Sequence, residues 1–196
     1  MSQRVLKRLV GTTHDKGGSV KVLVPETEIQ SAIAKLAAEI HAEYQGRPLT
    51  VLGILTGSVI LLADLIRQIE LPLRVGLLQA SSYRGTATTA GDFVINPDFI
   101  PDIANRDVLL LDDILDTGQT LTRILEQVQT LKPRSIRTAV LLWKHERTTF
   151  EVQPDYHCFR IPDEFVVGYG LDYDDHYRNL PYIATLDDED IAATGN

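Results

Sequence analysis

The sequence is poor in features that would mark a secreted, membrane or nucleic-acid-binding protein. Its one cysteine, Cys158, excludes a disulfide within the chain and a zinc site built from two cysteines. No run approaches the roughly 20 apolar residues of a membrane span, and residues 1–18 lack the apolar core of a secretory signal. The 19 basic residues are outnumbered by 27 acidic ones, for a net charge of −8. This balance disfavours general binding to nucleic-acid phosphates, and we expect a cytoplasmic protein.

The length and composition fit one ordinary globular domain. The chain has 196 residues, of which 44% are hydrophobic and 23% charged. A chain of this size buries about 70% of its extended surface, so its core needs no disulfide or structural metal. We expect residues 1–19, with Gly11, Gly17 and Gly18, to be a loosely ordered arm, and residues 20–196 to form a single domain.

Short apolar runs alternate with amphipathic segments along most of the chain. The expected strands cover residues 20–24, 49–55, 73–80, 93–95, 107–111, 135–143, 155–160 and 165–169. The expected helices cover residues 28–44, 59–69 and 121–131, and residues 81–92 are expected to form a long mobile loop. This alternation predicts an α/β fold with a mostly parallel twisted sheet flanked by helices.

The most informative segment is VLLLDDILDTGQTL, residues 108–121. An apolar strand runs into Asp112 and Asp113, which places these carboxylates at the carboxyl end of a parallel strand, where open α/β sheets bind ligands. Asp116 to Thr120 then lead into a helix, and such a loop with free N–H groups suits an anion. A ribose phosphate would fit such a site, because its hydroxyls can donate to the carboxylates while its phosphate binds at the free N–H groups. The alternative is that Asp116 or Thr120 merely caps the helix.

This segment resembles the motif with which type I phosphoribosyltransferases bind 5-phosphoribosyl-1-diphosphate (PRPP). Other segments are similar to the hypoxanthine-guanine phosphoribosyltransferase family, namely GILTG at 53–57, SSY at 81–83, LLWK at 141–144, IPDEFVVGYGLD at 161–172 and YRNLPY at 177–182. The resemblance spans about residues 20 to 186. It implies the type I phosphoribosyltransferase fold with a small hood region.

The resemblance implies a purine salvage transferase, a pentosyl glycosyltransferase that makes IMP or GMP and pyrophosphate from PRPP and hypoxanthine or guanine, with Mg²⁺. The implied phosphate-binding residues are Asp112, Asp113, Asp116, Thr117, Gly118, Gln119 and Thr120. Asp112 and Asp113 would hold the ribose hydroxyls and lie near the metal, and Asp172 would reach a second metal through water. Asp116 would be the general base that takes the proton from purine N7.

The remaining implied residues contact the base, the pyrophosphate and the lid. The implied purine-binding residues are Lys144, Phe165, Val166 and Asp172. The implied pyrophosphate-binding residues are Thr56, Gly57 and Arg178, and the implied lid residues are Ser82 and Tyr83. Lys144 would donate to the 6-oxo group and so reject adenine, which offers a donor there. The partners would be PRPP, the bases, the nucleotides and pyrophosphate, with no nucleic acid or membrane, and the assembly a homodimer or homotetramer.

The sequence departs from the family pattern at two positions. The pyrophosphate loop usually reads Leu-Lys-Gly but here has Thr56, which removes a cation. The family contact there is partly made by the backbone, often across a cis peptide. The acidic pair is usually Glu-Asp but here is Asp112-Asp113.

Two other functions stay open from the sequence. A nucleotide-sensing RNA-binding regulator on the same fold is disfavoured by the net charge of −8. An aspartyl-phosphate phosphotransferase usually needs acids two positions apart after the strand, and Ile114 stands there instead.

Overall fold

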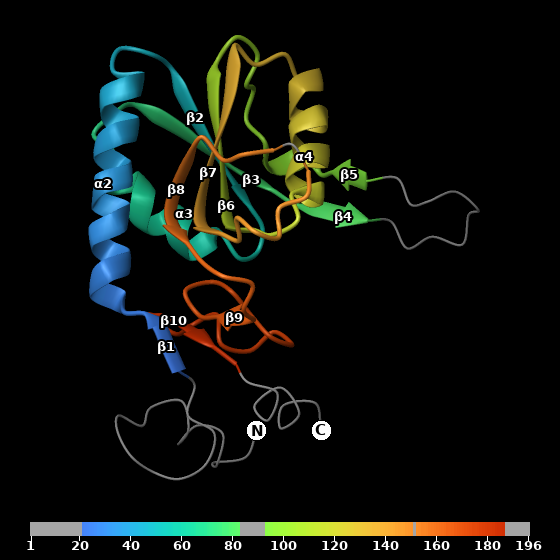
Figure 1. Cartoon of the computed structure of the whole chain (residues 1–196). Coiled ribbons are helices and arrows are strands. Elements are labelled where there is room, and N and C mark those ends of the chain that lie inside the picture. The colour runs from blue at the N-terminus through green and yellow to red at the C-terminus, as the bar shows by residue number, and fades with distance from the viewer. Residues whose placement is uncertain (1–20, 83–92, 151, 187–196) are drawn as a thin grey trace, which may run out of the picture.

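The centre of the molecule is a five-stranded parallel sheet. The structure is a computed structural model that describes residues 21–82, 93–150 and 152–186. The strand order is β3-β2-β6-β7-β8, and every neighbouring pair is parallel (Figure 1). The strands are β2 (Leu49–Ile54), β3 (Leu73–Leu78), β6 (Asp107–Leu115), β7 (Ser135–Trp143) and β8 (Tyr156–Arg160). This confirms the predicted α/β fold class.

Helices cover both faces of the sheet, so side chains of successive strand residues enter different cores. Helices α2 (Glu26–Tyr44) and α3 (Val59–Ile66) lie on one face, and α4 (Gln119–Thr130) lies on the other (Figure 1). On β6, Leu109 and Leu111 pack toward α2 and α3, while Val108 and Leu110 pack toward α4. The apolar runs of the central strands therefore reflect burial on both faces.

A small second sheet lies at the carboxyl edge of the main sheet and forms the hood. It joins β1 (Lys21–Val24), β10 (Ile183–Thr185) and β9 (Val166–Val167) in the order β1-β10-β9, all antiparallel (Figure 1). Separately, β4 (Ala80–Ser82) pairs with β5 (Phe93–Ile95), and the 3₁₀ helix η1 (Pro97–Phe99) follows.

Several element boundaries differ from the sequence prediction. Strand β6 runs to Leu115 instead of ending at residue 111, because its pairing with β7 continues to the Leu115–Trp143 pair. Helix α3 ends at Ile66, not at residue 69. Strand β10 and η1 were not predicted, and β4 includes residues 81 and 82, which were assigned to a loop. The arm, residues 1–19, lies outside the described residues, so the domain boundaries stay a prediction. In the part of the chain that is described, no helix is long and apolar enough to cross a membrane.

Candidate functional site

Two adjacent carboxylates lie in the last part of β6. Asp112 Oδ1 accepts from the Asp113 N–H at 3.1 Å, and Asp113 Oδ1 accepts from the Ile114 N–H at 2.9 Å. Burial raises the pKa of Asp112 well above its usual value, and the charge of Asp113 raises it further. Burial also raises the pKa of Asp113. Such a pair is electrostatically costly in the free protein and is relieved by a cation or by hydroxyl donors.

The loop after β6 leaves the start of α4 without a side-chain cap. The N-cap residue is Gly118, which has φ +90° and, lacking a side chain, makes no side-chain cap. A Cβ there would crowd Val152, so glycine suits both the conformation and the space. Thr117 Oγ1 lies 3.4 Å from the Gln119 nitrogen. The alternative in which Asp116 or Thr120 caps the helix is therefore wrong, and the free N–H groups remain available to an anion.

The segment from Leu55 to Gly57 packs against the acidic pair through its backbone. A cis peptide joins Leu55 and Thr56, and the Thr56 residue is exposed to solvent. A Cβ at Gly57 would overlap the Asp113 carboxylate, and a Cβ at Gly170 would overlap the Gly57 carbonyl oxygen. These glycines allow three segments distant in the sequence to meet at one place.

Arg178 joins the third of these segments to its neighbours. Its Nη1 donates to the Gly170 carbonyl at 2.8 Å, and its Nη2 lies 2.7 Å from Asp172 Oδ1. The other Asp172 oxygen, Oδ2, accepts from the Asp175 N–H at 3.0 Å. The Arg178 charge also acts on Asp113, because it lowers the pKa that burial raises. Arg178 and Asp172 therefore lie at the acidic pair as one ion pair.

The residues predicted to bind the purine come from the end of β7 and from the segment around β9. Lys144 is only 6% exposed, and its Nζ lies 3.2 Å from Asp163 Oδ1. Phe165 is 44% exposed and meets the Tyr173 ring edge to face, with centroids 5.4 Å apart. Val166 is buried in β9. An exposed aromatic ring can stack on a flat heterocycle, and an ammonium group can donate to an oxygen on the edge of one.

Arg147 is a site residue that the sequence analysis did not identify. Its Nε lies 2.7 Å from Asp116 Oδ1, and its Nη1 lies 2.9 Å from Asp163 Oδ1. The turn after β7 creates this contact, because the Arg147 N–H donates to the Lys144 carbonyl at 3.0 Å. Arg147 lies 31 positions after Asp116 in the sequence, and no spacing pattern signals their contact.

Most of the predicted lid, residues 83–92, lies outside the described residues. Tyr83 lies outside the described residues, and Ser82 is the last residue of β4. Their contacts with a ligand stay a prediction.

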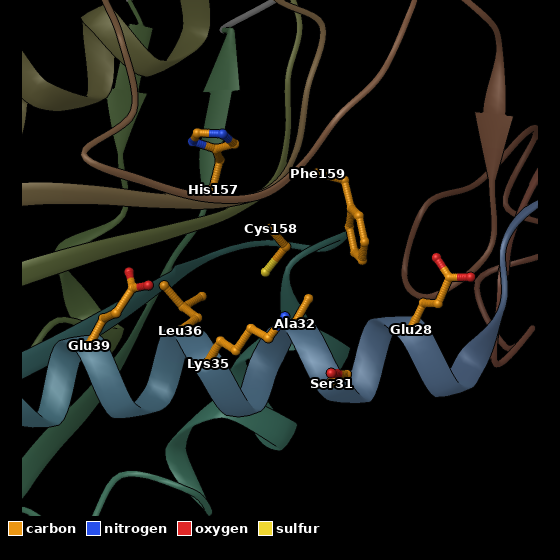
Figure 2. A pocket seen from close by; sticks show the side chains of 9 residues that line it. All are labelled: Glu28, Ser31, Ala32, Lys35, Leu36, Glu39, His157, Cys158 and Phe159. Carbon is orange, nitrogen blue, oxygen red and sulfur yellow. The ribbon is translucent and has the colours of Figure 1, made fainter.

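A separate cavity lies between α2 and β8, on the helix-covered side of the sheet edge (Figure 2). Its volume is about 310 Å³, and Lys35, Glu39 and Cys158 are among its lining residues. Burial raises the pKa of the Cys158 thiol to about 12, so the thiol is protonated at neutral pH and a poor nucleophile. None of the predicted site residues lines this cavity.

The acidic residues fit a metal that is held mainly by its substrate. Within residues 21–82, 93–150 and 152–186, no three metal-binding side chains converge to form a cage. Mg²⁺ keeps several waters and often takes one or two protein carboxylates together with substrate oxygens. The buried Asp112–Asp113 pair is a donor set of this kind.

The fold and the site together define a class, the α/β proteins that carry an acidic pair and a phosphate-type loop at the carboxyl edge of a parallel sheet. Residues 20–174 match the phosphoribosyl transferase domain family. A hypoxanthine-guanine phosphoribosyltransferase of Streptococcus pneumoniae strain R6 is 43% identical over 169 residues, which cover 86% of this chain and 94% of that protein.

Solved structures agree with this match. A hypoxanthine phosphoribosyltransferase of Staphylococcus aureus has a TM-score of 0.81 and 39% identity, with 100% of both chains covered. A mutant hypoxanthine phosphoribosyltransferase of Trypanosoma cruzi, in a ternary complex with substrates, has a TM-score of 0.80 and 36% identity, covering 87% of this chain and 96% of that one. The chain therefore belongs to the phosphoribosyltransferase family, and within it to the hypoxanthine-guanine phosphoribosyltransferases.

Proposed function

We propose that this protein is a purine salvage enzyme that transfers the 5-phosphoribosyl group of PRPP to N9 of hypoxanthine or guanine. The products are IMP or GMP and pyrophosphate. The observation that carries the proposal is the meeting of three features: the buried acidic pair of β6, the uncapped start of α4, and Lys144 paired with Asp163. The relatives described above are named as transferases of this kind, and none of them is named for RNA binding.

The 5-phosphate would bind in the loop from Asp116 to Thr120. The uncapped helix start presents N–H groups to the dianion, and the side chains of Thr117, Gln119 and Thr120 add polar groups. The ribose hydroxyls would donate to Asp112 and Asp113, which relieves the repulsion between these two buried carboxylates.

Pyrophosphate would lie between Arg178 and the backbone of Thr56 and Gly57. A guanidinium group suits phosphate oxygens because it offers several N–H donors in one plane. Arg178 is held in place by the Gly170 carbonyl and by Asp172. When bound, Mg²⁺ would neutralise the charge of the pyrophosphate, and Asp112, Asp113 and, through water, Asp172 would hold it.

The purine would stack on Phe165, with the backbone of Val166 at its edge. Lys144 would donate to the 6-oxo group, and the Asp116 carboxylate would face N7. As the N9 lone pair forms a bond to C1 of the ribose, the bond from C1 to the pyrophosphate oxygen breaks and the pyrophosphate takes the electron pair. The N7 proton moves to Asp116, which balances the charge left on the purine.

The test is turnover of PRPP and Mg²⁺ with hypoxanthine, guanine, xanthine and adenine, each followed by absorbance. We expect turnover of hypoxanthine or guanine and none of adenine, whose amino group would face Lys144 donor against donor. A folded protein that turned over neither 6-oxopurine would refute the proposal. Turnover of adenine would refute the role of Lys144 but leave the PRPP site intact. Cytoplasmic location and assembly as a dimer or tetramer are separate predictions, to be tested by fractionation and by light scattering.

A further inference from the structure

Four side chains of alternating charge form a row across the purine end of the site. Lys144 Nζ lies 3.2 Å from Asp163 Oδ1, the same oxygen lies 2.9 Å from Arg147 Nη1, and Arg147 Nε lies 2.7 Å from Asp116 Oδ1. The two ends of the row, Lys144 and Asp116, are the residues proposed to meet O6 and N7, which are neighbouring edge atoms of the purine. Asp163 and Arg147, which lie between these two residues in the row, therefore link the two groups that would contact the base.

The turn that carries Arg147 also fixes the backbone of Asp116. Thr148 Oγ1 donates to the Asp116 carbonyl at 2.9 Å. The N–H groups of Thr149 and Phe150 both donate to the Thr117 carbonyl, at 3.2 and 3.3 Å. Trp143 Nε1 donates to Thr148 Oγ1 at 3.1 Å, which orients this hydroxyl. With the main chain held in this way, Arg147 is the cation beside the Asp116 carboxylate, and Asp116 Oδ1 is a buried atom that has this close ion pair but no hydrogen bond.

We propose that Arg147 is a positioning residue that directs the Asp116 carboxylate toward N7 and ties it, through Asp163, to the Lys144 ammonium group. This inference rests on the proposed function and deepens it. A guanidinium group suits the task because its rigid plane of donors reaches two carboxylates at once, whereas a lysine ammonium is a single point charge on a flexible stem. Arg147 touches no reacting atom and acts only through its neighbours.

The ion pairs of Arg147 contribute little to folding, so function and stability can be separated. The Arg147 side chain is 47% exposed, and Asp116 and Asp163 are 40% and 49% exposed. Pairs this open to water are screened and are weak stabilisers. Arg147→Gln should therefore unfold at the same temperature as the parent protein.

The first experiment compares Arg147→Gln with a matched control, Arg137→Gln. Arg137 also lies near two carboxylates, with Glu43 at 2.8 Å and Asp155 at 3.9 Å, and its 42% exposure is similar, but it lies at the amino end of β7. We expect Arg147→Gln to lower kcat by about 10–100-fold, because small displacements of a catalytic group are this costly, with KM for PRPP changed less than about threefold. Arg137→Gln should keep the parent kcat, and Arg147→Lys should recover part of the loss.

The second experiment is a double-variant cycle with Asp116→Asn. If Arg147 acts through Asp116, adding Arg147→Gln to Asp116→Asn should lower kcat less than about twofold further, since groups that act as a unit are not additive. Multiplying losses would overturn the inference, and so would an Arg147→Gln enzyme with the parent kcat. Arg147→Met provides the same comparison if Arg147→Gln does not fold. An inactive parent protein would refute the proposed function itself, which distinguishes the two failures.

Discussion

Strand β6 carries a buried carboxylate at its start and two half-buried carboxylates near its end, and their surroundings differ. At its start, Asp107 is 1% exposed, accepts from two Arg134 nitrogens and from Ser135 Oγ at 2.7 Å, and these bonds lower its pKa to about 2. At its end, burial raises the pKa of Asp112 and of Asp113. One strand thus carries a carboxylate whose ionised form the fold stabilises and a pair whose ionised forms it disfavours.

The difference separates a structural role from a binding role. Asp107 has its partners within the fold, so its charge holds the amino ends of β6 and β7 together. Asp112 and Asp113 accept from backbone N–H groups of the same strand and interact with each other, and Arg178 is the cation that acts on Asp113. Perturbed carboxylates of this second kind cluster at functional sites because a ligand supplies what the fold omits.

The largest expected effect is at the catalytic end, just beyond β6. Asp116→Asn removes the proposed proton acceptor and should lower kcat about 10²–10⁴-fold, the usual contribution of a general base. Steady-state kinetics with hypoxanthine measures this, and Glu126→Gln on the exposed face of α4 is the control. A kcat within fivefold of the parent value would show that Asp116 is not the base.

The second largest expected effect is a loss of stability from a substitution at Asp107, at the start of β6. Asp107→Asn should lower the free energy of unfolding by about 2 kcal/mol, because the charge-assisted bonds to Arg134 weaken. That corresponds to a melting temperature lower by about 4–8 °C, while kcat/KM stays at the parent value. Asp98→Asn, at an exposed position, is the matched control. A large loss of activity in folded Asp107→Asn would refute a purely structural role for Asp107.

The contribution of Asp107 to the free energy of unfolding should also depend on pH. The folded pKa of Asp107, about 2, lies below the unfolded value of roughly 3.9. Its contribution is therefore fully present above about pH 4 and is lost as the pH falls toward 2. Denaturant unfolding of the parent and Asp107→Asn should give a difference that shrinks over this interval. A difference that is constant from pH 6 to 2.5 would refute the assignment.

The smallest effect has the opposite sign. Asp112→Asn removes one of two repelling buried charges, so it should raise the free energy of unfolding by about 1 kcal/mol at neutral pH, or about 2–4 °C. Because the folded pKa is raised, this cost is absent below the unfolded pKa of about 4, grows as the pH rises from there toward the folded pKa, and is constant above it. Calorimetry at pH 7 and pH 4 measures it. A less stable variant at pH 7 would mean that the pair is already satisfied.

Sequence reasoning recovers the elements whose pattern is local. The apolar runs of β2 and β7 and the periodic face of α2 predict their positions closely. The segment of three residues that forms β10 has no pattern of its own, because it becomes a strand only by pairing with β1 and β9. The end of β6 is missed for a similar reason, since its acidic residues are polar and only the pairing with β7 keeps them extended.

The same limit applies to the candidate site. The loop of Asp116 and the position of Lys144 could be predicted because a contiguous motif surrounds each of them. The contacts of Arg147 with Asp116 and Asp163 could not, because they join the turn after β7 to two other parts of the chain. Likewise, the Asp107–Arg134 pair joins residues 27 positions apart.

The contact between Gly57 and Gly170 has a consequence for how the sequence can drift. A Cβ at Gly170 would overlap the Gly57 carbonyl oxygen, and a Cβ at Gly57 would overlap the Asp113 carboxylate, so both positions require glycine. Thr56, by contrast, is exposed to solvent. A substitution at residue 56 should therefore leave the close approach of these segments intact, whereas a side chain at either glycine should force them apart.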